Sequence, residues 1–260
     1  MYSRTELMLG KEGLEKLKKA HVMVVGLGGV GAYAAEMLCR AGVGKMTIVD
    51  GDTVNITNRN RQLIALSSTE GEKKADCLAK RLREINNDIE LKVIDEYIIE
   101  ERMVELLKQD TYDYVVDAID TLTPKIFLIL SSLDLKIPIV SSMGSGGKLD
   151  PMQVRIDDIS KSYNCPLAFM VRKKLHKFGV YNGFAVVYSP EEVSPDVVAE
   201  DFGQNKRSTV GTISYLPPVF GCMCASVVIR KLIGVDPYME VKDNRYYANK
   251  KEKQEIICRK

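Results

Sequence analysis

Residues 21–50 contain the feature that most restricts how this chain can fold. A short apolar run leads into a Gly-x-Gly-Gly-x-Gly loop (26–31), and an alanine-rich segment without proline follows (32–41). A second apolar run (46–49) ends on Asp50. A strand, a glycine turn, a helix and a strand that ends on an acid form the βαβ unit of doubly wound sheets. The sequence therefore predicts a parallel sheet that begins with these two strands.

Strand-like and helix-like segments alternate along the rest of the first half. An amphipathic helix fragment comes first, at 14–18. Further helices are predicted at 73–85, 101–108 and 125–133, and further strands at 91–94, 112–117 and 138–142. This alternation, joined by right-handed crossovers, implies a mainly parallel sheet with helices on both faces. We expect an α/β, doubly wound, Rossmann-like fold.

The pattern is less regular in the second half. A strand at 153–156 suggests an additional antiparallel portion, residues 190–210 look like a loop, and 219–233 predicts a buried helix after two prolines. We expect a single domain with three portions: a nucleotide-binding core at 1–145, a substrate-facing and dimer-forming portion at 146–241, and a flexible polar tail at 242–260.

The composition excludes several classes of protein. The 37 basic and 35 acidic residues nearly cancel, so the net charge of +2 identifies no partner. The longest uncharged apolar run, 219–229, is far shorter than the ~20 residues that span a bilayer. The N-terminus lacks a signal-peptide core, so we expect a cytoplasmic protein with no membrane span. Six cysteines include no Cys-x-x-Cys pair, which predicts reduced, mostly buried thiols and no zinc.

The glycine loop predicts an adenine-nucleotide site. Gly26, Gly28, Gly29 and Gly31 let the backbone approach phosphates, which the helix N-terminus also attracts. Asp50 lies 22 residues beyond Gly28, where a carboxylate accepts hydrogen bonds from ribose hydroxyls. These features do not distinguish NAD from ATP.

The segment after the second strand favours ATP. Residues 55–62 carry two arginines among several amides, and Lys74 opens the next helix. Arginine offers forked donors to phosphate oxygens and stabilises departing pyrophosphate. Asp120 follows the strand that ends near Asp117, at the sheet edge where ligands bind, and a carboxylate beside a triphosphate most often holds Mg²⁺.

With these residues the chain resembles the E1-like adenylating enzymes, which include the ThiF and MoeB activators. The resemblance covers about the first 145 residues. The matching residues are Arg4, the glycine loop, Val49-Asp50-Gly51-Asp52, Asn58-x-x-Arg61-Gln62, Lys74 and Asp117-x-x-Asp120-Thr121. In that family ATP and a carboxylate react to give an acyl-adenylate and pyrophosphate.

The resemblance implies a role for each matching residue. Asp50 would hold the ribose and Asn58, Arg61 and Lys74 the phosphates, with Asp52 and Gln62 in the same nucleotide site. Asp120 would hold Mg²⁺. Arg4 would reach the ATP of a neighbouring subunit, which implies a homodimer. The implied catalytic residues are Arg61, Lys74, Asp120 and Arg4.

The second half narrows the resemblance to the tRNA threonylcarbamoyladenosine dehydratase branch. ThiF and MoeB relatives bind zinc through two Cys-x-x-Cys pairs, which this sequence lacks. It carries instead the segments 142–151, 154–161, 209–214 and 220–221, and the resemblance extends over about residues 3–234. In this branch the threonylcarbamoyl carboxylate on adenosine 37 of tRNA is activated and closed into a ring. The resemblance also allows a monovalent cation and a sulfur-handling partner protein.

A basic stretch at 161–180 is the candidate tRNA contact. It holds five lysines and arginines and no acid, and phosphate contacts of this kind strengthen tRNA binding. The expected contacts are Arg172, Lys173, Lys174 and Lys177, and Lys148, Arg155, Lys206 and Arg207 would extend the surface. The alternative is a solvated helix face without a partner.

Three other functions stay open at this stage. An E1-like activator of a ubiquitin-like sulfur carrier of the ThiS or MoaD type would need a Gly-Gly-tailed partner and, usually, zinc. An NAD-dependent oxidoreductase explains the glycine loop and Asp50 but leaves Asn58, Arg61 and Lys74 without a role. A non-catalytic nucleotide-sensing or RNA-binding scaffold would bind ATP without turnover.

Overall fold

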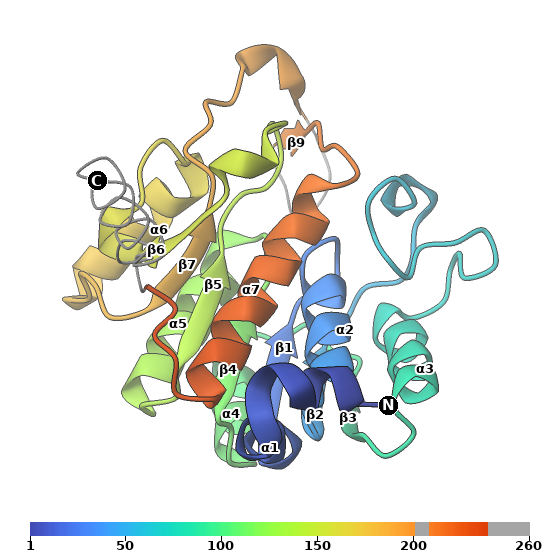
Figure 1. Cartoon of the computed structure of the whole chain (residues 1–260). Helices are drawn as coiled ribbons and strands as arrows, with labels where there is room; N and C mark the ends of the chain where they lie inside the picture. The colour runs from blue at the N-terminus through green and yellow to red at the C-terminus, as the bar shows by residue number, and fades with distance from the viewer. Residues whose placement is uncertain (201–207, 239–260) are drawn as a thin grey trace, which may run out of the picture.

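The computed structural model describes residues 1–200 and 208–238, and its centre is one seven-stranded sheet (Figure 1). The strands are β1 (His21–Val25), β2 (Lys45–Val49), β3 (Glu90–Ile94), β4 (Tyr114–Asp117), β5 (Ile139–Ser142), β6 (Arg155–Asp158) and β7 (Ala185–Tyr188). Their order across the sheet is β3-β2-β1-β4-β5-β7-β6, and only β6 runs antiparallel to its neighbour. The predicted doubly wound, mainly parallel sheet with an antiparallel addition is confirmed.

Helices cover both faces of the sheet. The α-helices are α1 (Ser3–Lys19), α2 (Gly31–Ala41), α3 (Lys74–Ile85), α4 (Glu100–Lys108), α5 (Leu122–Asp134), α6 (Pro166–Leu175) and α7 (Leu216–Leu232). α1, α2, α3 and α7 pack on one face, where α2 and α7 lie side by side, and α4, α5 and α6 pack on the other (Figure 1). None of the helices described is long and apolar enough to cross a membrane.

The short 3-10 helices lie in the connections. They are η1 (Ile56–Asn58), η2 (Pro151–Gln153), η3 (Ile159–Lys161), η4 (His176–Phe178) and η5 (Pro195–Val197). An Asn, Asp or Ser side chain caps each of η1, η2, η3 and η5 by accepting a backbone N–H, which is the usual way such residues begin a helical turn.

The central strand β1 shows why the sequence of the strands is so apolar. All five of its residues are buried, and their side chains alternate between the two faces. Val22 and Val24 pack with the helices of one face, and Met23 and Val25 pack with those of the other. A parallel strand covered on both faces needs apolar side chains at every position, which is the pattern seen from the sequence.

Four parts of the structure differ from the predicted elements. α6 and β7 were not predicted. Residues 190–210, expected to be a loop, contain the antiparallel strands β8 (Val198–Glu200) and β9 (Ser208–Val210). Pro217 and Pro218 lie inside the first turn of α7, where a missing N–H breaks no intrahelical bond. The predicted tail at 242–260 lies outside the described residues.

Most of the thiols are buried, as the composition predicted. Cys39, Cys77, Cys165 and Cys224 are buried, whereas Cys222, on the same helix as Cys224, is exposed. Burial raises the pKa of Cys224 to about 12, so this thiol stays protonated and behaves as a core side chain.

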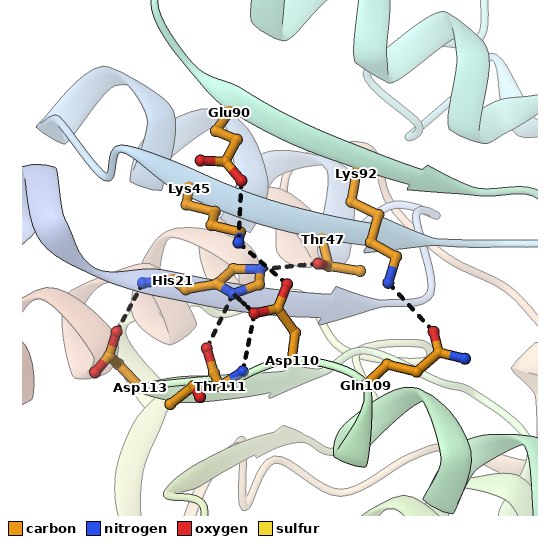
Figure 2. Close-up of polar contacts among 9 residues, drawn as sticks. All are labelled: His21, Lys45, Thr47, Glu90, Lys92, Gln109, Asp110, Thr111 and Asp113. Carbon is orange, nitrogen blue, oxygen red and sulfur yellow. Dashed lines mark hydrogen bonds and ion pairs between the residues drawn. The ribbon is translucent and has the colours of Figure 1, made fainter.

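Polar side chains cluster at the amino ends of the strands (Figure 2). We call this group the amino-edge cluster; it comprises His21, Lys45, Thr47, Glu90, Asp110, Thr111 and Asp113. The Nδ1 of His21 lies 3.0 Å from the carbonyl oxygen of Thr111, and its Nε2 lies 2.9 Å from the hydroxyl of Thr47. Since a carbonyl only accepts, Nδ1 carries the proton of the neutral ring and Nε2 accepts from Thr47. Burial lowers the pKa of His21, and the nearby Asp110 only partly opposes this.

Charged partners complete the amino-edge cluster. The ammonium of Lys45 lies 3.0 Å from a carboxylate oxygen of Glu90 and 3.1 Å from one of Asp110. Asp113 accepts the backbone N–H of His21 at 2.7 Å. These bonds join the amino ends of β1, β2 and β3 to the turn before β4, so the cluster fixes this edge of the sheet.

Candidate nucleotide site

The predicted site residues gather at the opposite edge, where the parallel strands end. The glycine loop follows β1, Asp50 follows β2, and Asp120 lies just beyond β4. The strand order reverses between β1 and β4, and doubly wound folds bind their ligands outside the carboxyl ends at this point. Residues from three separate parts of the sequence therefore lie at the same edge of the sheet.

Two glycines of the loop cannot be replaced without moving the backbone. Gly26 has φ +87°, and a Cβ there would lie 2.8 Å from the carbonyl oxygen of Ala118. A Cβ on Gly31 would lie 1.7 Å from the carbonyl oxygen of Gly26. By contrast, the first atom that a Cβ on Gly28 would meet is the Gln62 amide nitrogen at 3.5 Å. The loop is therefore packed tightly against β4 but bordered by a polar side chain over Gly28.

The fourth glycine joins the loop to other elements. A Cβ on Gly29 would lie 2.9 Å from the ring of Pro217 and 3.4 Å from the side chain of Arg61. The first turn of α7 and the arginine segment therefore both pack against the loop.

The carboxylate of Asp50 fixes the backbone of the glycine loop and of the turn after β2. One carboxylate oxygen accepts the backbone N–H of Leu27 at 2.6 Å, and the other accepts that of Asp52 at 2.8 Å. A carboxylate has about four acceptor positions, so two remain for ligand hydroxyls. Burial raises the pKa of Asp50, and the positive charge of Lys74 partly opposes the shift.

η1 starts the arginine segment with a reciprocal cap. The Asn55 side chain accepts the N–H of Thr57 at 2.9 Å, and the Asn58 side chain accepts the N–H of Asn55 at 3.1 Å. The amide oxygen of Asn58 is thus occupied in shaping this turn.

Arg61 is held by its own segment and is influenced by the charge of Asp120. Its Nη1 donates to the carbonyl oxygen of Thr57 at 3.1 Å and to the side-chain oxygen of Asn60 at 2.9 Å. Burial lowers the pKa of Arg61, and the negative charge of Asp120 partly opposes the shift. The guanidinium therefore lies within the electrostatic influence of this carboxylate.

Gln62 presents an unsatisfied polar atom in the site. Its side chain is buried, and its Oε1 accepts no hydrogen bond from the described part of the chain. A buried oxygen in this state costs about 1–3 kcal/mol. Because the same amide borders Gly28, a ligand seated on the glycine loop would be within its reach.

Lys74 is the buried first residue of α3 and is paired with Asp52. Its ammonium lies 2.7 Å from one carboxylate oxygen of Asp52, and the hydroxyl of Tyr97 donates to the other at 2.5 Å. The bond to Asp52 raises the pKa of Tyr97 to about 12, so Tyr97 stays a donor. An ammonium has three N–H donors, and the ion pair leaves Lys74 with others to offer a phosphate.

A fully buried ion pair lies next to the turn that leads to Asp120, and the sequence did not predict it. The ammonium of Lys125, on α5, lies 2.6 Å from Asp117 and donates to the Ser141 hydroxyl at 3.1 Å and the Ser142 carbonyl at 2.9 Å. The other oxygen of Asp117 accepts the N–H of Ile119 at 3.0 Å. We call Asp117, Lys125 and Ser141 the carboxyl-edge cluster; it shapes the turn that leads to Asp120.

Arg4 does not join the site within one chain. It is exposed at the start of α1, and the neighbouring Tyr2 packs on Gly42, just past the end of α2. The glycine loop lies at the other end of α2, and an 11-residue helix is about 16 Å long.

The basic residues expected to bind tRNA divide into two groups. Lys173, Lys174 and Lys177 are exposed on α6 and η4, whereas Arg172 is partly buried and donates to the carbonyl oxygen of Ser162 at 2.7 Å. The expectation that Lys148 extends this surface is wrong. Lys148 is only 2% exposed, because its ammonium is drawn inside to the carbonyl oxygen of Glu191.

Three further residues were expected to extend this surface, and two of them, Lys206 and Arg207, lie outside the described residues. Arg155 is exposed on β6, with its guanidinium 5.6 Å from the ring centre of Tyr163.

No three His, Cys, Asp or Glu side chains within residues 1–200 and 208–238 gather as a metal site. Asp120 is a single carboxylate beside the arginine segment. Mg²⁺ bound to a nucleotide commonly takes one or two protein carboxylates, with phosphate oxygens and water as the other ligands. The residues present therefore fit a nucleotide-bound Mg²⁺ rather than an ion held by protein alone.

Fold and site together define a nucleotide-binding protein of the Rossmann-like class. Comparison with known proteins identifies the family within this class. The chain belongs to the ThiF family, which it matches over residues 2–259.

Its similarity to characterised relatives extends over nearly the whole chain. A Bacillus subtilis tRNA threonylcarbamoyladenosine dehydratase is 40% identical over 252 residues, which are 93% of this chain and 98% of that protein. The Escherichia coli enzyme of the same name is 39% identical over 180 residues, 69% of this chain and 67% of that protein. The crystal structure of the E. coli dehydratase with ATP matches the fold with a TM-score of 0.81 at 34% identity, over 89% of this chain and 93% of that one.

Proposed function

We propose that this chain is an ATP-dependent dehydratase that adenylates the carboxylate of N6-threonylcarbamoyladenosine at position 37 of tRNA and closes it to the cyclic form. The observation that carries the proposal is its near full-length similarity to the B. subtilis dehydratase. The E. coli dehydratase, which shares the fold, was crystallised with ATP.

ATP fits the geometry of the carboxyl edge. The triphosphate would lie on the glycine loop at the N-terminus of α2, with Arg61 and Lys74 as its cations. Asp50 has two acceptor positions left for the ribose hydroxyls, and Gln62 would gain a partner from the nucleotide. Asn58 and Asp52 would act mainly through the turn of η1 and through Lys74.

The reaction requires activation of the substrate carboxylate, and the attacking group comes from the substrate rather than from the protein. A free carboxylate is a poor acyl donor because hydroxide is a poor leaving group. Adenylation replaces that leaving group with AMP, and the carbamoyl nitrogen or oxygen of the same substituent can then attack. An intramolecular attack gains an effective molarity of order 10⁵ M or more in favourable cases. This agrees with the buried, protonated state of Cys224.

Metal ions enter the proposal at one residue. Asp120 would hold the Mg²⁺ that accompanies ATP, where the ion neutralises charge on the departing pyrophosphate. A monovalent cation and a sulfur-handling partner protein remain expectations of the family resemblance, and no residues are assigned to them.

The proposal includes a tRNA surface and a second subunit. Lys173, Lys174 and Lys177 would contact tRNA phosphates, with Arg172 held more rigidly against Ser162. Arg4 would reach the ATP of the other subunit in a cytoplasmic homodimer. The exposed Leu7 and Met8 on the same helix supply apolar surface for such a contact.

The decisive test is mass spectrometry of nucleosides from threonylcarbamoylated tRNA incubated with the protein and Mg-ATP. We expect the modified adenosine to lose the mass of one water, only when ATP is present. An unchanged nucleoside, together with ATP–pyrophosphate exchange stimulated by a Gly-Gly-tailed carrier protein, would replace the proposal with activation of a sulfur carrier.

A further inference from the structure

Asn60 connects the arginine segment to a distant part of the chain. Its Nδ2 donates to the carbonyl oxygen of Thr212 at 3.0 Å, across 152 residues of sequence. Its Oδ1 accepts the Nη1 of Arg61 at 2.9 Å. The two ends of one amide thus hold two different partners, and only this orientation of the amide satisfies both.

Thr212 belongs to a segment that contacts two loops at the carboxyl edge of the sheet, namely the arginine segment and the loop after β5. We call residues 189–200 and 208–215 the cover segment; it follows β7 and precedes α7. The N–H of Gly147 donates to the carbonyl oxygen of Gly211 at 2.7 Å, and the hydroxyl of Tyr215 donates to that of Leu149 at 2.8 Å. One end of the cover segment is therefore fixed to the loop that follows β5.

The other end of the cover segment is fixed to the same loop by Glu191. Its carboxylate accepts the backbone N–H groups of Leu149 and Asp150, each at 2.9 Å. Its carbonyl oxygen accepts the buried ammonium of Lys148 at 2.5 Å. A buried charged donor and two charge-assisted bonds make this a firm attachment.

Arg61 is the point where this arrangement meets the nucleotide site. Its guanidinium has five N–H donors, and the bonds to Thr57 and Asn60 use those on Nη1. Fixing one nitrogen of a planar fork directs the others, so the orientation of Arg61 depends on Asn60.

We propose that Asn60 is a positioning residue that orients Arg61 toward the ATP phosphates and couples its position to the cover segment. The inference rests on the proposed function in one respect, namely that Arg61 contacts ATP. Binding of ATP then changes the surroundings of residues 211–215. By reciprocity, loss of the bond between Asn60 and Thr212 changes the affinity for ATP.

The chain offers a clean optical probe because it contains no tryptophan. Ile213 is 39% exposed and adjoins Thr212, so Ile213→Trp places a single reporter in the cover segment. The probe ligand is the non-hydrolysable analogue α,β-methylene-ATP with Mg²⁺. Tryptophan emission reports on the cover segment, and calorimetry on the protein without the reporter gives the dissociation constant independently.

We expect the analogue to change the emission of Ile213→Trp. In Asn60→Ala the dissociation constant should rise about five- to tenfold, which corresponds to the net contribution of one ordinary intramolecular hydrogen bond, and the emission change should disappear. Ser68→Ala, an exposed change on the same connection between β2 and α3, should alter neither quantity. Equal thermal midpoints for the variants exclude a folding defect.

Each other outcome has a definite meaning. An unchanged dissociation constant in Asn60→Ala, or an emission change that survives in it, overturns the inference and leaves the proposed function standing. An analogue that binds without changing the emission of Ile213→Trp also overturns the coupling. Failure of the unaltered protein to bind the analogue at all would overturn the proposed function itself.

Discussion

The two edges of the sheet carry similar polar and charged side chains. They differ in how many of the hydrogen-bonding groups already have a partner within the chain. In the amino-edge cluster, His21, Lys45 and Asp113 each bond to other residues of the chain. At the carboxyl edge, Arg61 and Lys74 keep donors for other partners and Gln62 has an unsatisfied buried oxygen. The difference teaches that polar residues in a sheet indicate a ligand only when their bonds remain incomplete.

The largest expected effect distinguishes two aspartates on opposite edges. Asp120→Ala should abolish adenylation with little change in the free energy of unfolding, because the side chain is exposed and, in the proposed function, would hold the metal. Asp113→Ala should do the reverse. It removes the acceptor of the His21 N–H, costs about 1 kcal/mol of unfolding free energy, and leaves turnover unchanged. Turnover by the nucleoside assay and urea unfolding measure both. Full activity of Asp120→Ala would remove that residue from the site.

The next comparison concerns two lysines. Lys125→Met leaves the carboxylate of Asp117 buried and uncompensated, so the unfolding free energy should fall by about 3–5 kcal/mol. Lys45→Met breaks partly exposed ion pairs, which solvent screens, and should lower the unfolding free energy much less. Adding Asp117→Asn to Lys125→Met should recover part of the loss. Equal effects of the two lysines in urea unfolding would show that burial does not separate the clusters.

A smaller effect is expected on tRNA binding. Lys173→Glu combined with Lys174→Glu should weaken tRNA affinity about tenfold or more at fixed salt and leave ATP binding intact, because two phosphate contacts become repulsive. Lys108→Glu combined with Lys136→Glu makes the same charge change at the amino-edge side of the molecule and should have little effect. Fluorescence anisotropy measures both pairs. Equal losses of tRNA affinity in the two double variants would mean that tRNA binding depends only on the net charge of the protein.

The smallest expected effect is on the pH dependence of stability. Burial lowers the pKa of His21, so the unfolded chain binds this proton more readily than the folded one. Stability should therefore fall as the pH drops below about 6.5, the ordinary value for histidine, and should be retained above it. His21→Gln should flatten this part of the curve of unfolding free energy against pH. A slope identical in both proteins would assign it to other groups.

The sequence predicted the elements with strong local signals and missed those whose pattern was interrupted. β1, α2 and β2 were expected because apolar runs and glycines mark them directly. α6 was missed although Ala168, Val171 and Leu175 repeat at helical spacing, because the lysines among them drew the interpretation toward a tRNA surface. β7 is a run of only four buried residues, too short to separate from a loop.

The site was predictable where one residue acts alone and unpredictable where two distant residues pair. The positions of the glycine loop, Asp50 and Arg61 follow from chain order along a parallel sheet. Lys148 looked like a surface cation, but its partner Glu191 lies 43 residues away and draws it inside. The bond between Asn60 and Thr212 spans still more of the chain. Such contacts depend on packing that no local pattern encodes.

The position of β6 in the sheet has a consequence for synthesis of the chain on the ribosome. β6 ends at Asp158 and its only strand partner in the described sheet, β7, ends at Tyr188, so 30 further residues must be made before the pair can form. At about 5–20 residues per second this takes roughly 2–6 s. The edge of β5 that β7 later covers stays open for longer, because β5 ends at Ser142 and 46 further residues must be made before β7 is complete. During that time the nascent chain carries an unpaired apolar edge, which makes this the stage at which chaperones would act on it.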